Sequence, residues 1–266
     1  MKKEKAGFKV ETAAIVIPAA LVVSILIFKF VFGAPGNFIG GNPENLPLQG
    51  NFSGTIYKGG FIVPILMTFL LTVITFCIER YLTIGKAEGK GSSINLIAKV
   101  KANLEKHEVK QAMELCDNQK GSLGNVVKSG LIKYQDVEND STMSKEQKTL
   151  AIQKDIEEAT SLELPTLEQN LVILATLSSV STLMGLLGTV LGMIRSFAAM
   201  ANAGAPDSVK LATGISEALI NTAFGIGTAA LAVIAYSYFT TKIDKITYSI
   251  DEAGYTLVQT YASAHK

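Results

Sequence analysis

The chain has 266 residues, of which 48% are hydrophobic and only 18% are charged, and its formal net charge is +1. Soluble domains carry about a quarter charged residues, so the composition indicates a membrane protein. Acidic and basic residues are concentrated together between residues 84 and 165, which leaves no basic face suited to nucleic acid.

Four apolar segments are long enough to cross a bilayer, whose core of about 30 Å needs roughly 20 apolar residues in a helix. They lie within residues 1–33, 61–83, 167–201 and 209–241. The first two are rich in large aliphatic residues, and we expect them to face lipid. The last two are dense in Gly, Ala, Ser and Thr, which allow helices to approach closely. We expect these two to line a protein interface or a pore.

The first segment follows a basic leader of the kind that also begins a signal peptide. Its apolar run is about 20 residues long, and the cleavage-like site Gly33-Ala34 precedes Pro35. We therefore interpret the segment as an uncleaved anchor. The following loop, 34–60, is dominated by Gly, Pro and Asn, so we expect irregular structure there and interpret the sequon at Asn51 as a chance match.

Lysines are distributed unevenly among the segments that connect the spans. Residues 1–12 carry four lysines and segment 84–166 carries twelve, whereas the loop 34–60 and the turn 202–208 carry one between them. The positive-inside rule then places both termini, segment 84–166 and the C-terminal helix 242–266 in the cytoplasm. The loop and the turn are predicted to be periplasmic.

Segment 84–166 is predicted to form a helical cytoplasmic domain, because its apolar residues recur at helical spacing. Ser144 followed by Gln147 predicts a capping box that opens a long helix. We expect this helix to run towards the third span, with a kink or break around Pro165.

Few residues outside the spans point to a chemical site. Cys77 and Cys116 lie in an apolar run and in a charged helix, respectively, so we expect no structural disulfide. His107 and His265 have no second ligand at suitable spacing, which argues against a metal site. The sequence has no phosphate-binding loop, nucleophile elbow or metalloprotease motif. It therefore predicts neither an enzyme nor a cofactor.

A charge in the middle of a membrane helix costs at least about 2.5–3.5 kcal/mol and therefore indicates a functional site. Glu217 lies about ten residues beyond the outward turn, which puts it roughly 15 Å deep at 1.5 Å per residue. Steps of three and four residues place Thr213, Asn221 and Thr228 on the same face of the fourth span. One side of this helix is therefore polar along most of its length.

The third span carries a similar polar face, which includes Thr182 and Thr189. Two such faces on adjacent antiparallel helices can line a wet path. The alternative is that the hydroxyl groups only join helices by hydrogen bonds. Arg195 is interpreted as an interfacial anchor at the outward end of this span. The small residues of both spans are expected to pack a homo-oligomeric ring; they include Gly185, Gly188, Gly192 and Ala218.

These two spans also carry a family resemblance. Residues 184–193, MGLLGTVLGM, resemble the GLLGTVxGM signature of the ExbB/TolQ/MotA proton-channel family. Residues 214–225, GISEALINTAFG, resemble its GIAEALxxTAxG signature. The similarity covers roughly residues 61 to 250. The first span and the loop 34–60 are additional to the usual three-span plan of the family.

The resemblance implies a ring, generally a homopentamer, around the transmembrane helices of an ExbD/TolR-like dimer whose Asp takes up the proton. It places Thr189, Thr222 and Glu217 at the lumen, and we expect Thr182 and Asn221 to border the same ion path. In ExbB-like members the motor works with a TonB-like protein and energises uptake through the outer membrane. TolQ-like and gliding or flagellar stators use the same channel for other work.

The sequence thus predicts an all-α, polytopic protein of a bacterial inner membrane. It should have four transmembrane helices in contact with lipid and a helical cytoplasmic domain, and it should assemble into a homo-oligomeric ring. The predicted function is the proton-channel scaffold of an ExbB-type motor. An alternative of another class is a structural or transporter-like bundle in which Glu217 is a paired packing residue. Transporters usually contain internal repeats, and the dissimilar pairs of spans give no sign of one.

Overall fold

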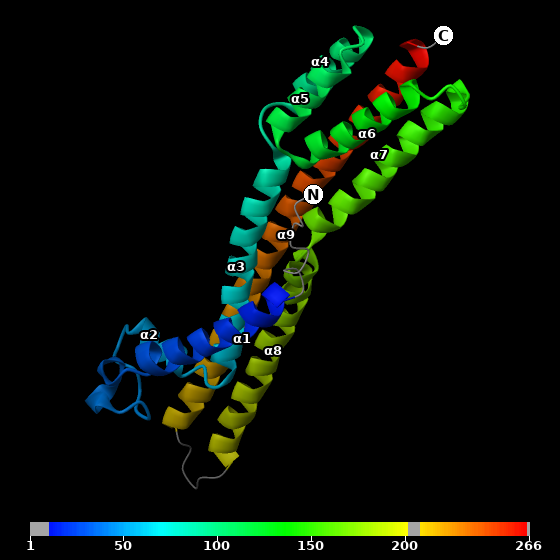
Figure 1. Ribbon diagram of the computed structural model, residues 1–266. Helices are drawn as coiled ribbons and strands as arrows, with labels where there is room; N and C mark the ends of the chain where they lie inside the picture. Colours follow the sequence, from blue (N-terminus) through cyan, green and yellow to red (C-terminus); the bar gives the residue numbers. More distant parts are fainter. Residues whose placement is uncertain (1–10, 202–207, 265–266) are drawn as a thin grey trace. The chain divides into compact units, whose positions relative to one another are not determined.

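The computed structural model describes residues 11–201 and 208–264, and these residues form an all-helical protein (Figure 1). The basic leader, most of the turn 202–208 and His265 lie outside the described residues. The helices of 16 or more residues are α1 (Glu11–Leu26), α3 (Ile62–Glu88), α6 (Ser122–Glu138), α7 (Lys145–Glu168), α8 (Leu171–Ala201) and α9 (Ser208–Ala264). The shorter helices are α2 (Phe52–Tyr57), α4 (Ser93–Glu105) and α5 (Val109–Gln119).

Four helical stretches are long and apolar enough to cross a membrane, as predicted. The first is Ala13–Phe32, and the other three begin at Ile62, Lys145 and Ser208. A π-helix, Ile27–Phe32, continues α1 to the end of the first stretch. The all-helical class with four candidate spans is confirmed.

The chain divides into two compact units, and α3 and α9 each contribute residues to both. The apolar unit comprises residues up to 78 together with 170–236, and it holds most of the apolar helix length. The charged unit comprises residues 79–169 together with 237 onward.

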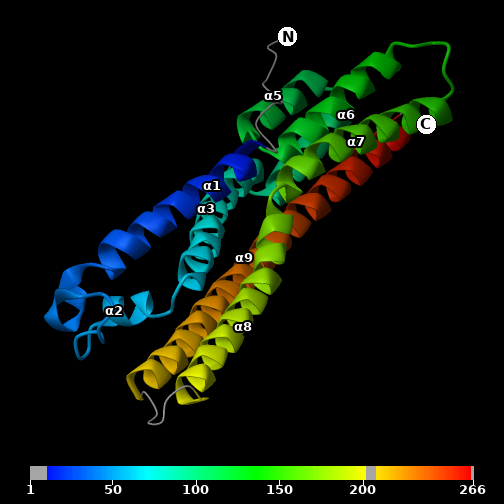
Figure 2. The same cartoon turned by 90° about the horizontal axis from the view of Figure 1, so that it is seen from below.

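Within the apolar unit, α8 and the first half of α9 lie side by side, as Figures 1 and 2 both show. A Cβ atom on Gly192 would lie 2.7 Å from the carbonyl oxygen of Gly214, and one on Gly225 would lie 2.6 Å from that of Ser181. The two backbones therefore touch, which only small residues allow. The expected close packing is present, but it lies within one chain. These glycines therefore join α8 to α9, and their part in a homo-oligomeric ring stays a prediction.

Helix α3 is the most buried of the candidate spans. In its apolar window 50% of the residues are buried, compared with 33% in the windows that include α8 and α9 and 11% in the first stretch. Val63, Leu66 and Phe76 are fully enclosed. Large aliphatic side chains of α3 thus fill the interior of the chain, whereas α1 leaves most of its surface uncovered. That these two helices face lipid stays a prediction.

The loop 34–60 is irregular over much of its length, as predicted, although it contains two short 3-10 turns and the six-residue helix α2. Asparagine side chains fix its course. Asn37 Nδ2 donates to the carbonyl oxygens of Val31 and Phe32, at 2.8 and 3.0 Å, where the π-helix ends. Asn51 Nδ2 donates to Asn37 Oδ1 at 3.1 Å, and Asn51 Oδ1 caps α2 by accepting from Gly54 N at 2.9 Å. The sequon at Asn51 therefore coincides with a structural asparagine.

In the charged unit, α7 opens with the predicted capping box between Ser144 and Gln147. The helix ends at Glu168, so the expected break falls a few residues after Pro165, where Asn170 adopts a left-handed conformation with φ 64°. A side chain of α3 explains why α7 ends at this position. Arg80 is buried and donates to the carbonyl oxygens of Thr166, at 3.3 Å, and Leu167, at 3.1 Å. It thus satisfies carbonyl groups that the last turn of a helix leaves without partners.

Candidate functional site

The candidate site centres on Glu217, which α9 buries in its seam with α8. Only 4% of the Glu217 side chain is exposed. Arg195 on α8 supplies the opposite charge: its Nη1 lies 2.5 Å from Oε1 and 2.7 Å from Oε2 of Glu217. A buried charge is tolerated only when it is paired and hydrogen-bonded, and Arg195 meets that requirement.

The turn before α3 closes the other side of this ion pair. Gly60 has φ 76°, a conformation that side chains rarely adopt, and a Cβ atom there would lie 2.5 Å from Glu217 Oε1. Phe61 follows it, and the centre of its ring lies 5.9 Å from Arg195 Cζ, within the range of a cation–π contact. Three segments that are distant in sequence thus meet at one carboxylate.

Asn221 lies one turn further along α9 and is completely buried. Its Nδ2 donates to the carbonyl oxygen of Gly59 at 2.9 Å, so it also binds the turn before α3. Its Oδ1 is buried and has no hydrogen-bond partner within 11–201 and 208–264. The polar face predicted for the fourth span is therefore turned towards α3 and α8 at this level.

The predicted threonines are divided between two environments. Thr189 on α8 and Thr222 on α9 are half-buried, and their hydroxyl groups contact each other across the helix pair. Thr182 is exposed, and its hydroxyl donates back to Ser178 O at 3.2 Å within α8. The structure therefore brings Thr189 and Thr222 together and leaves Thr182 outside the cluster.

Sequence reasoning missed Arg195 as a member of the site, because its position near the end of a span favoured an interfacial anchor. A register argument could have found it. Arg195 lies seven residues before residue 202, and Glu217 lies ten residues after residue 207. Adjacent antiparallel helices therefore place the two within about one helical turn of each other, a distance that a long arginine side chain can cover.

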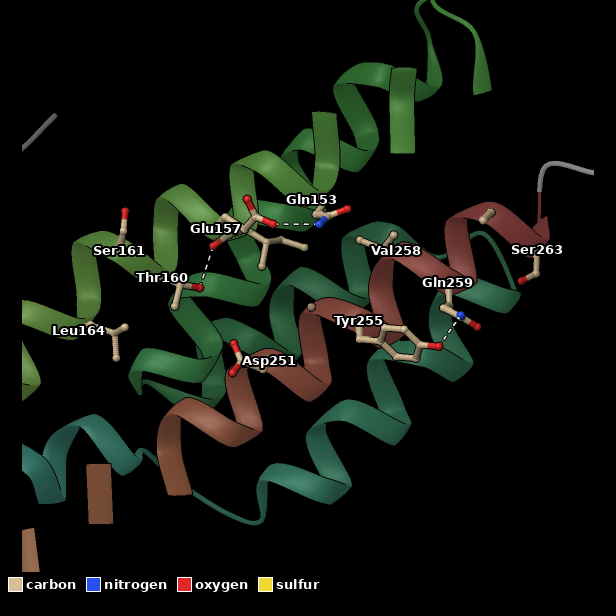
Figure 3. A pocket seen from close by; sticks show the side chains of 13 residues that line it. Gln153, Glu157, Thr160, Ser161, Leu164, Asp251, Tyr255, Val258, Gln259 and Ser263 are labelled. Atoms are coloured by element: carbon tan, nitrogen blue, oxygen red, sulfur yellow. Dashed lines mark hydrogen bonds between the residues drawn. The ribbon is translucent and has the colours of Figure 1, made fainter. Parts of the chain in front are cut away.

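The charged unit contains a groove of about 910 Å³ between α7 and the last part of α9 (Figure 3). Its polar lining residues bond mainly along their own helices: Gln153 Nε2 donates to Glu157 at 2.9 Å, and Gln259 Nε2 donates to Tyr255 Oη at 2.6 Å. No group of three or more His, Cys, Asp or Glu residues that could hold a metal occurs in the part of the chain that the structure describes. The ion pair of the apolar unit, with its buried carboxylate, is therefore the stronger candidate site.

Four candidate spans, with a buried glutamate paired to a half-exposed arginine between two of them, are typical of a multi-pass membrane protein with a charged site in its helix bundle. Residues 118–252, half of the chain, match the MotA/TolQ/ExbB proton channel family. The chain belongs to this family, and the resemblance of its two signatures is thereby confirmed.

Curated relatives agree with this membership. The chain is 40% identical over 84 residues to the Tol-Pal system protein TolQ of Haemophilus influenzae, covering 32% of this chain and 37% of that protein. It is 42% identical over 88 residues to TolQ of Pseudomonas aeruginosa, covering 33% and 38%. It is 40% identical over 70 residues to the biopolymer transport protein ExbB of Salmonella typhimurium, covering 26% and 29%. The matched stretches thus span less than two fifths of each relative.

Proposed function

We propose that this chain is the proton-channel scaffold of an inner-membrane motor that uses the proton motive force to energise TonB-dependent transport through the outer membrane. The observation that carries the proposal is the burial of Glu217 between two candidate spans. An ionisable residue inside a membrane helix marks an ion pathway by default, because its insertion is costly. Membership of the MotA/TolQ/ExbB proton channel family supports the same function.

We assign the ion path to the polar groups around the seam of α8 and α9. Three buried oxygens support this assignment, since they have no hydrogen-bond partner within the described ranges and are able to bind water; they are Ser181 Oγ, Asn221 Oδ1 and Thr228 Oγ1. The residues proposed to border the path are Glu217, Thr189, Thr222, Asn221 and Thr182.

We assign the proton-accepting group to a partner, because Arg195 already binds the carboxylate of Glu217. The partner would be an ExbD/TolR-like single-span subunit, present as a dimer in the lumen of a homopentameric ring. Each proton that crosses 100 mV supplies about 2.3 kcal/mol, which the partner would transmit to a TonB-like protein.

The proposed location is the inner membrane, with both termini and segment 84–166 in the cytoplasm. A cysteine introduced at Asn45, in a background without Cys77 and Cys116, should react with an impermeant thiol reagent in spheroplasts. A cysteine at Lys120 should stay unlabelled until the membrane is opened. The reverse labelling pattern would contradict this topology.

A second candidate is the TolQ type of motor, which two of the relatives named above favour by their identity. Copurification from native membranes separates the two candidates. An ExbD-like partner together with a TonB-like protein would support the first, and a TolR-like partner would support the second. Wild-type uptake that persists after a protonophore collapses the proton gradient would refute the first.

A further inference from the structure

Arg195 joins the buried carboxylate of the site to the surface of the chain. Its guanidinium binds both oxygens of Glu217, at 2.5 and 2.7 Å. The exposed fraction of the side chain is 51% for Arg195 and 4% for Glu217. The arginine is therefore the member of the pair that a group outside the chain can reach.

The carboxylate itself has little freedom to move. The backbone of Gly60 lies so close to Glu217 that a Cβ atom there would come within 2.5 Å of Oε1 and 3.1 Å of Cδ, and within 3.4 Å of Arg195 Nη1. Asn221, one turn along α9, ties the same turn to the helix through Gly59 O at 2.9 Å. Glu217 is thus held between a fixed backbone and a guanidinium, and only the guanidinium has open surroundings.

Arg195 has a second contact, with the ring of Phe61. Phe61 places its ring centre 5.9 Å from Cζ of the guanidinium, and 58% of this phenylalanine is exposed. A cation–π contact at a half-open position is weak enough to be exchanged for a stronger one. A carboxylate on a neighbouring helix would be such a competitor, because charge-assisted hydrogen bonds to arginine are short and strong.

We propose that Arg195 is a positioning residue that closes the ion path by holding Glu217 inside the chain. The path opens when a carboxylate of the partner subunit draws the guanidinium away. This inference deepens the proposed function and rests on it. It differs from a packing role, because an ion pair that only stabilises the bundle has no effect on the rate of proton movement.

The test uses the full chain in liposomes that contain a pH-sensitive dye, with proton influx driven by a potassium diffusion potential. Arg195→Gln should raise the flux about tenfold, which corresponds to about 1.4 kcal/mol of lost closing free energy. Adding Glu217→Gln to this variant should return the flux to the wild-type level. Arg195→Lys keeps the charge and should stay close to wild type. Lys29→Gln is the matched control, since it removes an exposed cation of the apolar unit that lies outside the pair.

Flux through Arg195→Gln equal to that of wild type and Lys29→Gln would overturn the proposal. So would a flux that stays high in the double variant, because the leak would then be independent of Glu217. If Arg195→Gln fails to fold, the double variant Arg195→Glu with Glu217→Arg, which exchanges the two charges, replaces it. Low proton flux through this double variant supports the proposal, and high flux overturns it. These measurements use the chain alone. Failure of the proposed function would appear as uptake that does not depend on the proton gradient. It is therefore distinguishable from failure of this inference.

Discussion

Glu217→Gln separates a role in the ion path from a role in packing. Glutamine keeps the shape of the side chain, and its oxygen can still accept a hydrogen bond from Arg195. The lost charge attraction is partly screened, since half of the arginine side chain is exposed. We therefore expect a loss of about 1–2 kcal/mol in the free energy of unfolding, between the values for exposed ion pairs and for hydrogen bonds to charged groups.

That loss is too small to remove the protein from the membrane. Domains are stable by about 5–15 kcal/mol, so a remainder of about 3 kcal/mol still leaves roughly 99% of the chains folded. We expect the energised uptake of the proposed function to fall about tenfold or more, which a folding defect of this size does not explain.

The comparison must be made at equal abundance in the membrane, with partner binding measured in parallel. Glu114→Gln is the matched control, because Glu114 is exposed on α5 in the charged unit. Uptake at the wild-type level in Glu217→Gln would refute the reasoning and return Glu217 to the class of packing residues. Equal losses in both variants would refute it as well.

Three further predictions concern single side chains. Thr189→Val should reduce energised uptake more mildly than Glu217→Gln, because it removes a hydroxyl contact between α8 and α9 without removing a charge. Gly188→Leu should destabilise the chain by about 1–3 kcal/mol or more in a thermal melt, since a side chain there would collide with Asn221. The control Gly227→Leu points into open space and should have little effect. Burial, with a smaller contribution from Asp117, raises the pKa of the Cys116 thiol to about 12, so at pH 8 the thiol should resist alkylation until the protein unfolds. Rapid labelling of the folded chain would contradict this.

Local signals in the sequence were sufficient for the helices and much of the site. The apolar lengths gave the four candidate spans, and Ser144 with Gln147 gave the start of α7. Glu217 stood out because a charge in an apolar helix is rare. These inferences depend on residues that are near one another in the chain.

The missed features depend on contacts between distant segments. The pairing of Arg195 with Glu217 follows from the register of α8 against α9, and the enclosure by Gly60 follows from where α3 begins. Pro165 predicted a break near the end of α7, but not its exact position at Glu168, because the side chain that stabilises this end belongs to α3. The extent to which α3 is buried could not be predicted for a similar reason, since aliphatic composition is the same for a buried helix and an exposed one.

Arg80 also has a consequence for biogenesis. It leaves the ribosome long before Thr166 and Leu167, the residues whose carbonyl oxygens it will bind. During that interval its neighbour Glu79 can neutralise the guanidinium, because the two side chains form an ion pair between adjacent positions. The second span can therefore be inserted with the charge of Arg80 already balanced by Glu79. When α7 forms, Arg80 is already in place to bind the carbonyl groups of its last turn.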